Sequence, residues 1–218
     1  MALAIVLINV VVFTIAFLRT NIAEELHSIW VRAHALAFSA WVVLFLMQSI
    51  LIASRRQDMH RELGIAGIYL AALMIILTIM SGIGTYALGA PRPAIDTFML
   101  SVVVHVDMVT FTILVTAGLL FRRLDLDIHK RLMLLATIAV GWRSPVFGRF
   151  SGLDAMLGAK LPHYVDQVML VLVAILYDMI SRRRVNPAYI CGGLVILVLP
   201  SAADFAFRYF VPHLVAPR

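Results

Sequence analysis

Long apolar runs separated by short polar connections dominate this chain. A helix that crosses a bilayer needs about 20 predominantly apolar residues, and seven runs come near that length. They are residues 2–18, 29–53, 64–88, 97–121, 130–150, 163–180 and 187–211. We therefore predict an all-α integral membrane protein, one domain over residues 1–218. The expected fold is a helical bundle of about seven transmembrane helices with a central four-helix core formed by spans two to five.

Two of the seven runs are less regular than the others. The fifth carries Arg143, Pro145 and Arg149 in its second half, so its helix is expected to break at the proline, and a six-span chain remains an alternative. The first run has no basic segment before it and no small-residue cleavage site after Leu18. We interpret it as a helix of the mature chain, not as a signal peptide.

Composition supports the membrane assignment. Hydrophobic residues make up 62% of the 218 residues and charged residues 14%, and the mean hydropathy is +0.98, values outside the usual range of soluble domains. The net charge of +6 does not indicate nucleic-acid binding, because the basic residues crowd the connections between apolar runs. The expected surroundings are the lipid bilayer.

The basic connections also predict an orientation. The loops at 54–63, 121–131 and 181–187 hold three, four and three Lys or Arg residues, ten of the 18 in the chain. Loops rich in Lys and Arg stay in the cytoplasm, which places the N-terminus inside and the C-terminus in the periplasm. A compact chain of this kind suits a bacterial inner membrane.

Four histidines give the pattern its chemistry. His34 and His105 fall towards the outer ends of spans two and four, and His60 and His129 at the inner ends of spans three and five. An ionisable side chain in or beside hydrocarbon is costly without a partner. One histidine per span, alternating outer and inner as the chain reverses direction, predicts two haem irons at two depths.

Neighbouring residues extend this hypothesis. Gly64 and Gly67 follow His60 on its helical face and leave room for a flat macrocycle, while Arg61, Lys130 and Arg131 can pair with haem propionates. The only cysteine, Cys191, excludes the Cys-x-x-Cys-His attachment motif, so the haems would be b-type and non-covalent. The alternative interpretation is that the glycines serve helix packing and that the two outer histidines form a hydrogen-bonded pair without metal.

The alternation resembles the cytochrome b561 family, in which four central helices each supply one histidine. This resemblance covers roughly residues 29–150 and rests on spacing. It implies that His34 and His105 ligate one haem b, and that His60 and His129 ligate the other. The strings His60-Arg61-Glu62-Leu63-Gly64 and His129-Lys130-Arg131-Leu132-Met133 are also similar to those of a group of bacterial polytopic membrane proteins with no assigned activity. Haem A synthase likewise uses four histidines on a bundle.

A second polar group is expected in the outer half of the bundle. His163, Asp166 and Arg143 can exchange protons with a quinol, or can form structural ion pairs. Trp41 and Gln48 lie on the same helical stripe as His34. We expect them to line a haem edge or a quinone path, or alternatively to pack in a helix interface. Asp178 is expected to pair with Arg182 one turn later.

The resemblance implies an oxidoreductase that transfers electrons across the membrane through two bis-histidine haems, with a quinol as a candidate donor. The sequence identifies neither donor nor acceptor. The alternative is a cofactor-free accessory or assembly subunit of a larger membrane complex, or a small transporter. No internal repeat of the transporter type is evident.

Overall fold

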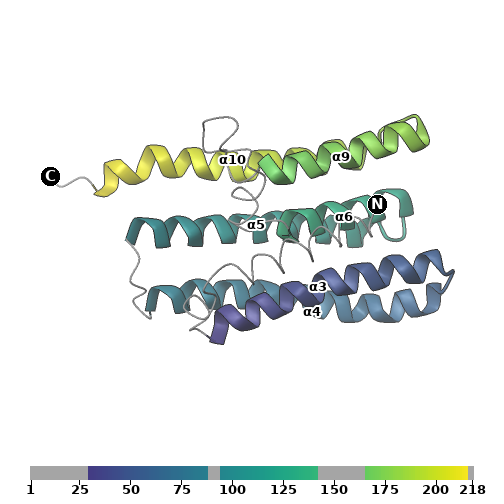
Figure 1. Cartoon of the computed structure of the whole chain (residues 1–218), viewed down its shortest axis with the longest axis horizontal. Helices are drawn as coiled ribbons and strands as arrows, with labels where there is room; N and C mark the ends of the chain where they lie inside the picture. The colour runs from purple at the N-terminus through teal and green to yellow at the C-terminus, as the bar shows by residue number, and fades with distance from the viewer. Residues whose placement is uncertain (1–28, 88–93, 142–164, 216–218) are drawn as a thin grey trace, which may run out of the picture. The chain divides into compact units, whose positions relative to one another are not determined.

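The computed structural model describes residues 29–87, 94–141 and 165–215, and all regular structure within these ranges is α-helical (Figure 1). The six helices are α3 (Ile29–Ala53), α4 (Gln57–Ala87), α5 (Ala94–Phe121), α6 (Leu126–Gly141), α9 (Val165–Arg182) and α10 (Pro187–Val215). The all-α prediction is confirmed for these ranges, in which no strand occurs. The predicted first span, 2–18, lies outside the described residues.

Helix boundaries agree with the apolar runs where polar residues do not intervene. Helix α3 matches the predicted span 29–53. Helix α4 begins at Gln57, before the predicted start at residue 64, so the polar segment around His60 is also helical. Helix α6 is described only to Gly141, short of the predicted end at 150, and Pro145 lies outside the described residues.

Three short turns reverse the chain, and in two of them a side chain caps the helix that follows. Asp125 Oδ1 accepts the backbone N–H groups of Asp127 and Ile128 at 2.7 and 3.0 Å and caps α6. Asn186 Oδ1 accepts the N–H of Ala188 at 2.9 Å and so caps α10, whose first residue is Pro187. The turns therefore join α3 to α4, α5 to α6 and α9 to α10.

The chain divides into two compact units, which we describe separately. Unit 1 comprises residues 1–84 and 140–166, and its described part is mainly the hairpin of α3 and α4. Unit 2 comprises residues 85–139 and 167–218 and contains α5, α10 and nearly all of α6 and α9.

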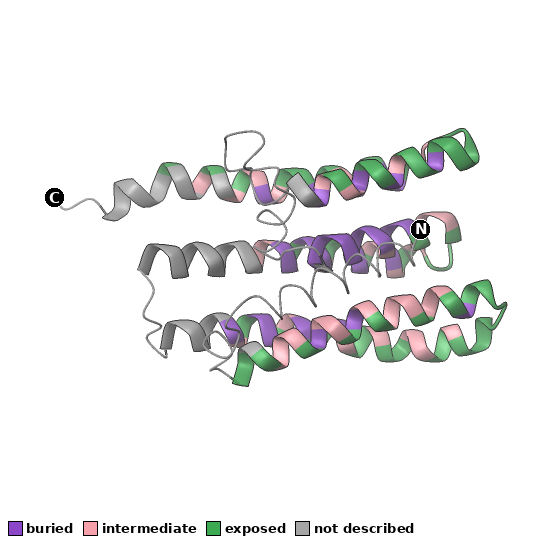
Figure 2. Ribbon diagram, viewed as in Figure 1, coloured by how far each residue is buried: buried purple, intermediate pink, exposed green. Residues whose placement is uncertain are grey.

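Unit 2 is held together by close contacts at small residues. Helix α10 packs on α5, and a Cβ built on Gly192 of α10 would lie 2.5 Å from Leu135 of α6 and 3.2 Å from Leu114 of α5. Gly193 faces Val171 of α9. Leu135 and Ile138 are fully buried, and Figure 2 shows α6 buried along most of its length.

The α3–α4 hairpin has the features of membrane helices. Arg32–Ala53 and Gln57–Ser81 are long and apolar enough to cross a bilayer, and only 17% and 22% of their most apolar windows are buried. Large side chains such as Leu36 and Tyr69 are more than two thirds exposed. Ser39 and Ser49 donate to backbone carbonyls one turn earlier, so these hydroxyls need no water. Length, composition and exposure together indicate membrane association.

Candidate cofactor site

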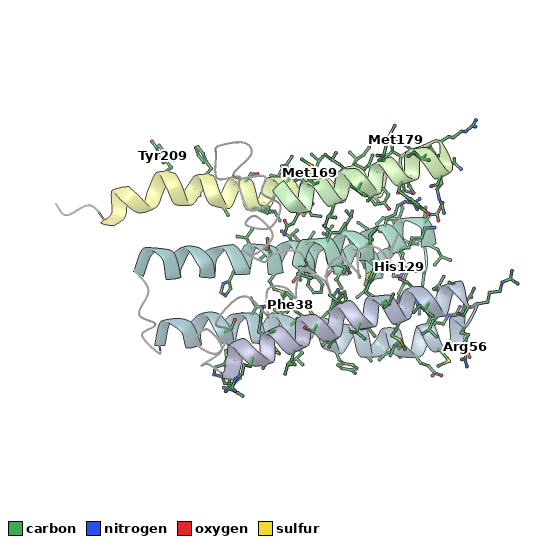
Figure 3. The ribbon with its side chains drawn as sticks, in the orientation of Figure 1. Phe38, Arg56, His129, Met169, Met179 and Tyr209 are labelled. Carbon is green, nitrogen blue, oxygen red and sulfur yellow. The ribbon has the colours of Figure 1, made fainter. Side chains whose placement is uncertain are left out.

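His34 lies on α3 and contacts α4 within unit 1. Its Nδ1 is 3.4 Å from the Thr78 hydroxyl, which donates its own proton to the Met74 carbonyl at 2.8 Å. Because that proton is already used, the His34 Nδ1–H is the donor, and the lone pair of the neutral ring belongs to Nε2. Phe38 lies against the ring with centroids 4.2 Å apart, and Figure 3 labels its position on α3.

His129 is oriented in the same way within unit 2, and it is labelled in Figure 3. Its Nδ1 lies 2.7 Å from the backbone carbonyl oxygen of Gly118 on α5. A carbonyl only accepts, so Nδ1 carries the proton and Nε2 the lone pair of the neutral ring. Metal-ligating histidines almost always hold their second nitrogen by such a bond, and the arrangement is therefore suited to a ligand that coordinates through Nε2.

His60 and His129 occupy equivalent positions in their own hairpins. The backbone N–H of His60 bonds to the Arg56 carbonyl at 3.1 Å, and that of His129 bonds to the Asp125 carbonyl at 3.0 Å. Each histidine thus closes the first turn of a helix that follows a basic connection. The similarity of the two sequence strings reflects this shared place in a hairpin.

The two hairpins separate their histidines by different lengths. His34 is level with Thr78, which lies 18 residues after His60 on α4, a rise of about 27 Å. His129 is level with Gly118, which lies 13 residues after His105 on α5, a rise of about 20 Å. The separation along the helix axis is therefore about 7 Å larger in the α3–α4 hairpin than in the α5–α6 hairpin.

The glycines near His60 face α3. A Cβ on Gly67 would lie 3.1 Å from Leu44, and one on Gly64 would lie 3.7 Å from Gln48 Nε2. Gly118 similarly faces Met133 on α6. At these positions protein side chains fill the space that the glycines create, which is their ordinary role in helix packing.

Two of the three basic residues assigned to propionates have partners inside unit 2. Arg131 is 3% exposed and donates from Nε and Nη2 to Asp178 Oδ2 at 2.9 and 2.7 Å, and from Nη1 to the Asp127 carbonyl at 2.7 Å. Lys130 forms an ion pair with the Asp127 carboxylate. Arg61 is exposed. A propionate role for Arg131 and Lys130 stays a prediction. A bound propionate would compete with Asp178 and Asp127 for these two side chains.

The principal partner of Asp178 is not the residue that the sequence pattern predicts. Its expected partner, Arg182, lies 4.0 Å away, whereas Arg131, 47 residues distant in sequence, is the closer one. Tyr189 adds its ring face 5.6 Å from the Arg131 guanidinium carbon. No local pattern identifies these contacts, because the three residues come from three helices.

The remaining predicted site residues are described only in part. His105 is half-buried on α5 and Asp107 is buried with 5% exposure. His163 and Arg143 lie outside the described residues, as does the side chain of Asp166. Within the helices that the structure describes, no three His, Cys, Asp or Glu side chains gather as a metal site, although a haem iron held by two imidazoles needs no third.

Comparison with known proteins adds no relative: no family model, curated protein or solved structure matches this chain.

Proposed function

We propose that this protein is a membrane b-type dihaem protein that transfers electrons across the bilayer, with His34 and His105 as ligands of one haem and His60 and His129 as ligands of the other. The observation that carries the proposal is the 2.7 Å contact between His129 Nδ1 and the Gly118 carbonyl. This bond holds the ring and leaves Nε2 as the nitrogen that would coordinate a haem iron, as the outer hydrogen bond of a metal ligand does.

The donor chemistry of the described residues fits haem. Imidazole nitrogens are common axial ligands, and bis-histidine haem, when bound, supplies one-electron transfer without an open iron position. The residues of this chain would orient the rings: the Thr78 hydroxyl on His34 and the Gly118 carbonyl on His129. The faces of Gly64 and Gly67 are occupied by α3 side chains, so a macrocycle would lie against other faces of these helices.

Spectroscopy of the purified protein tests the proposal. We expect a reduced-minus-oxidised spectrum of b-type haem from cells supplied with haem. Alanine at His60 or His129 should remove one haem, and alanine at His34 or His105 the other, while His27→Gln should remove neither. Two haems retained in each of the four ligand variants would overturn the assignment.

A conservative variant separates orientation from ligation. Thr78→Val keeps the shape of the side chain and removes the oxygen that accepts from His34 Nδ1. We expect both haems to stay bound and the midpoint potential of one to change, because the hydrogen bond tunes ligand basicity. Identical potentials in the variant and the parent would contradict the role given to Thr78.

Two observations favour a second candidate, a cofactor-free accessory or assembly subunit of a larger membrane complex. Leu44 fills the space at Gly67, and Arg131 is paired with Asp178 inside unit 2. Contacts of this kind hold helices together without a cofactor. A colourless, folded preparation from haem-replete cells would select this candidate.

A further inference from the structure

The end of unit 2 at which the α5–α6 and α9–α10 turns lie is strongly basic. Arg182 Nη1 at the end of α9 lies 3.0 Å from Asp127 Oδ2 at the start of α6, so the two turns are neighbours. The four turn arginines Arg122, Arg123, Arg183 and Arg184 are all exposed. We call these four residues the basic end.

The basic end keeps its charge after internal pairing. Asp178 is bound by Arg131, and Asp127 is bound by Lys130 and Arg182. Asp125 directs its Oδ1 at the first backbone N–H groups of α6. Within the described part of the chain, none of the four arginines has an ion-pair partner of its own, so four positive charges face outwards.

Arg183 occupies a backbone position that favours glycine. Its φ is +56°, and its N–H bonds to the Met179 carbonyl at 3.0 Å. This left-handed cap is the position at which glycine normally ends a helix. In unit 1, Arg55 follows α3 with the same left-handed backbone conformation, at a φ of +59°. The neighbouring Arg56 is labelled in Figure 3. Two hairpins thus carry arginine where the backbone favours glycine.

Exposed apolar side chains accompany these arginines. Leu124 and Leu126 in the α5–α6 turn are 77% and 70% exposed, and Ile180 before Arg183 is 76% exposed. Water alone, or a purely ionic partner, satisfies the guanidinium groups but not these side chains. A phospholipid offers a phosphate for the arginines and acyl chains for the leucines.

We propose that the basic end binds the phosphate headgroups of anionic phospholipids. The inference does not depend on haem and holds equally for a cofactor-free subunit. The headgroup phosphates would lie among the four arginines, and the first acyl carbons would lie against Leu124, Leu126 and Ile180. The bound lipid would therefore anchor the turns at one membrane surface.

The test measures binding of fluorescent phosphatidylglycerol and phosphatidylcholine to the full chain in a non-ionic detergent. Phosphatidylglycerol should bind about tenfold more tightly than phosphatidylcholine at low salt, and the difference should shrink as salt is added. Arg183→Gly should weaken phosphatidylglycerol binding about fivefold without loss of thermal stability. The matched control, Arg32→Gln, removes one exposed arginine from the first turns of α3 and should leave binding unchanged.

A second variant keeps the test decisive if Arg183→Gly does not fold. Arg123→Gln with Arg184→Gln leaves the left-handed position intact and should weaken binding about 25-fold. Equal affinity for the two lipids, or equal effects of Arg183→Gly and Arg32→Gln, would overturn the proposal. Displacement of the lipid by millimolar inorganic phosphate at constant ionic strength would also overturn it, since the site would then select the free anion.

Discussion

Arg131 of α6 binds Asp178 of α9 through two nitrogens at 2.9 and 2.7 Å, and both side chains are almost completely buried. The contact joins helices that are distant in sequence and places a paired charge inside unit 2. Removing one partner leaves the other charge buried and uncompensated, which is far more costly than losing the pair as a whole.

Asp178→Ala is therefore expected to destabilise the protein by about 3–5 kcal/mol. The double variant Arg131→Met with Asp178→Leu should recover most of this loss, because two apolar side chains of similar size carry no desolvation cost. The stabilities of the single and the double variant are measured by denaturation in detergent, with circular dichroism as the signal. A double variant no more stable than Asp178→Ala would show that the pair stabilises unit 2 by more than mutual neutralisation.

Asp127 provides a pH-dependent contact at the surface. The hydrogen bond from Lys130, aided by the charges of Arg182 and Arg131, lowers the pKa of this carboxyl below its ordinary value of 3.8. A lowered folded-state pKa contributes stability that is present above pH about 4 and is lost as the pH falls through the folded-state value. Since Asp127 is about half exposed, the contribution should stay below about 1 kcal/mol.

Comparison of Asp127→Asn with the parent between pH 2 and 7 checks this expectation. The free energy of unfolding of the parent should exceed that of the variant near pH 7, and this difference should disappear on acidification. Protonation of Asp178 does not affect the difference, because both proteins retain this residue. A stability difference that is independent of pH would show that hydrogen bonding, and not charge, makes the contact.

Two glycine substitutions distinguish close packing from ordinary contact. Gly192→Ala places a methyl group 2.5 Å from Leu135, which is fully buried and cannot move aside easily, so we expect a loss of about 1–3 kcal/mol. Gly64→Ala meets Gln48 Nε2 at 3.7 Å and should gain up to about 1 kcal/mol from helix propensity. Thermal denaturation of the two variants gives the comparison, and equal effects would be inconsistent with the close approach of α10 to α6.

Gln48 has a buried Oε1 atom with no hydrogen-bond partner among the described residues. Gln48→Met keeps the size of the side chain and removes this desolvated acceptor, so the variant should be more stable by about 1 kcal/mol. Urea denaturation in mixed micelles measures the change. Destabilisation would instead mean that Gln48 binds a group beyond the described residues, as the haem-edge or quinone interpretation requires.

The sequence determined the helical architecture and the basic turns. Apolar runs of bilayer length favour helices, because a helix satisfies its backbone hydrogen bonds internally, and the clusters of arginine mark where the hairpins reverse. Helix α3 matches its run for this reason, whereas α4 starts earlier because the polar segment around His60 is also helical. The spacing of the four histidines was visible in the sequence, but their orientation was not.

Only the tertiary structure decided which side chains meet. Arg131 binds Asp178 because α9 brings that carboxylate within 2.7 Å, and Gly67 lies against Leu44 because α3 packs along that face of α4. Thr78 and Gly118 became partners of histidines through the same helix pairing. Such contacts depend on helix rotation and register between residues far apart in the chain, whereas hydropathy and periodicity report only on a helix and its immediate neighbours.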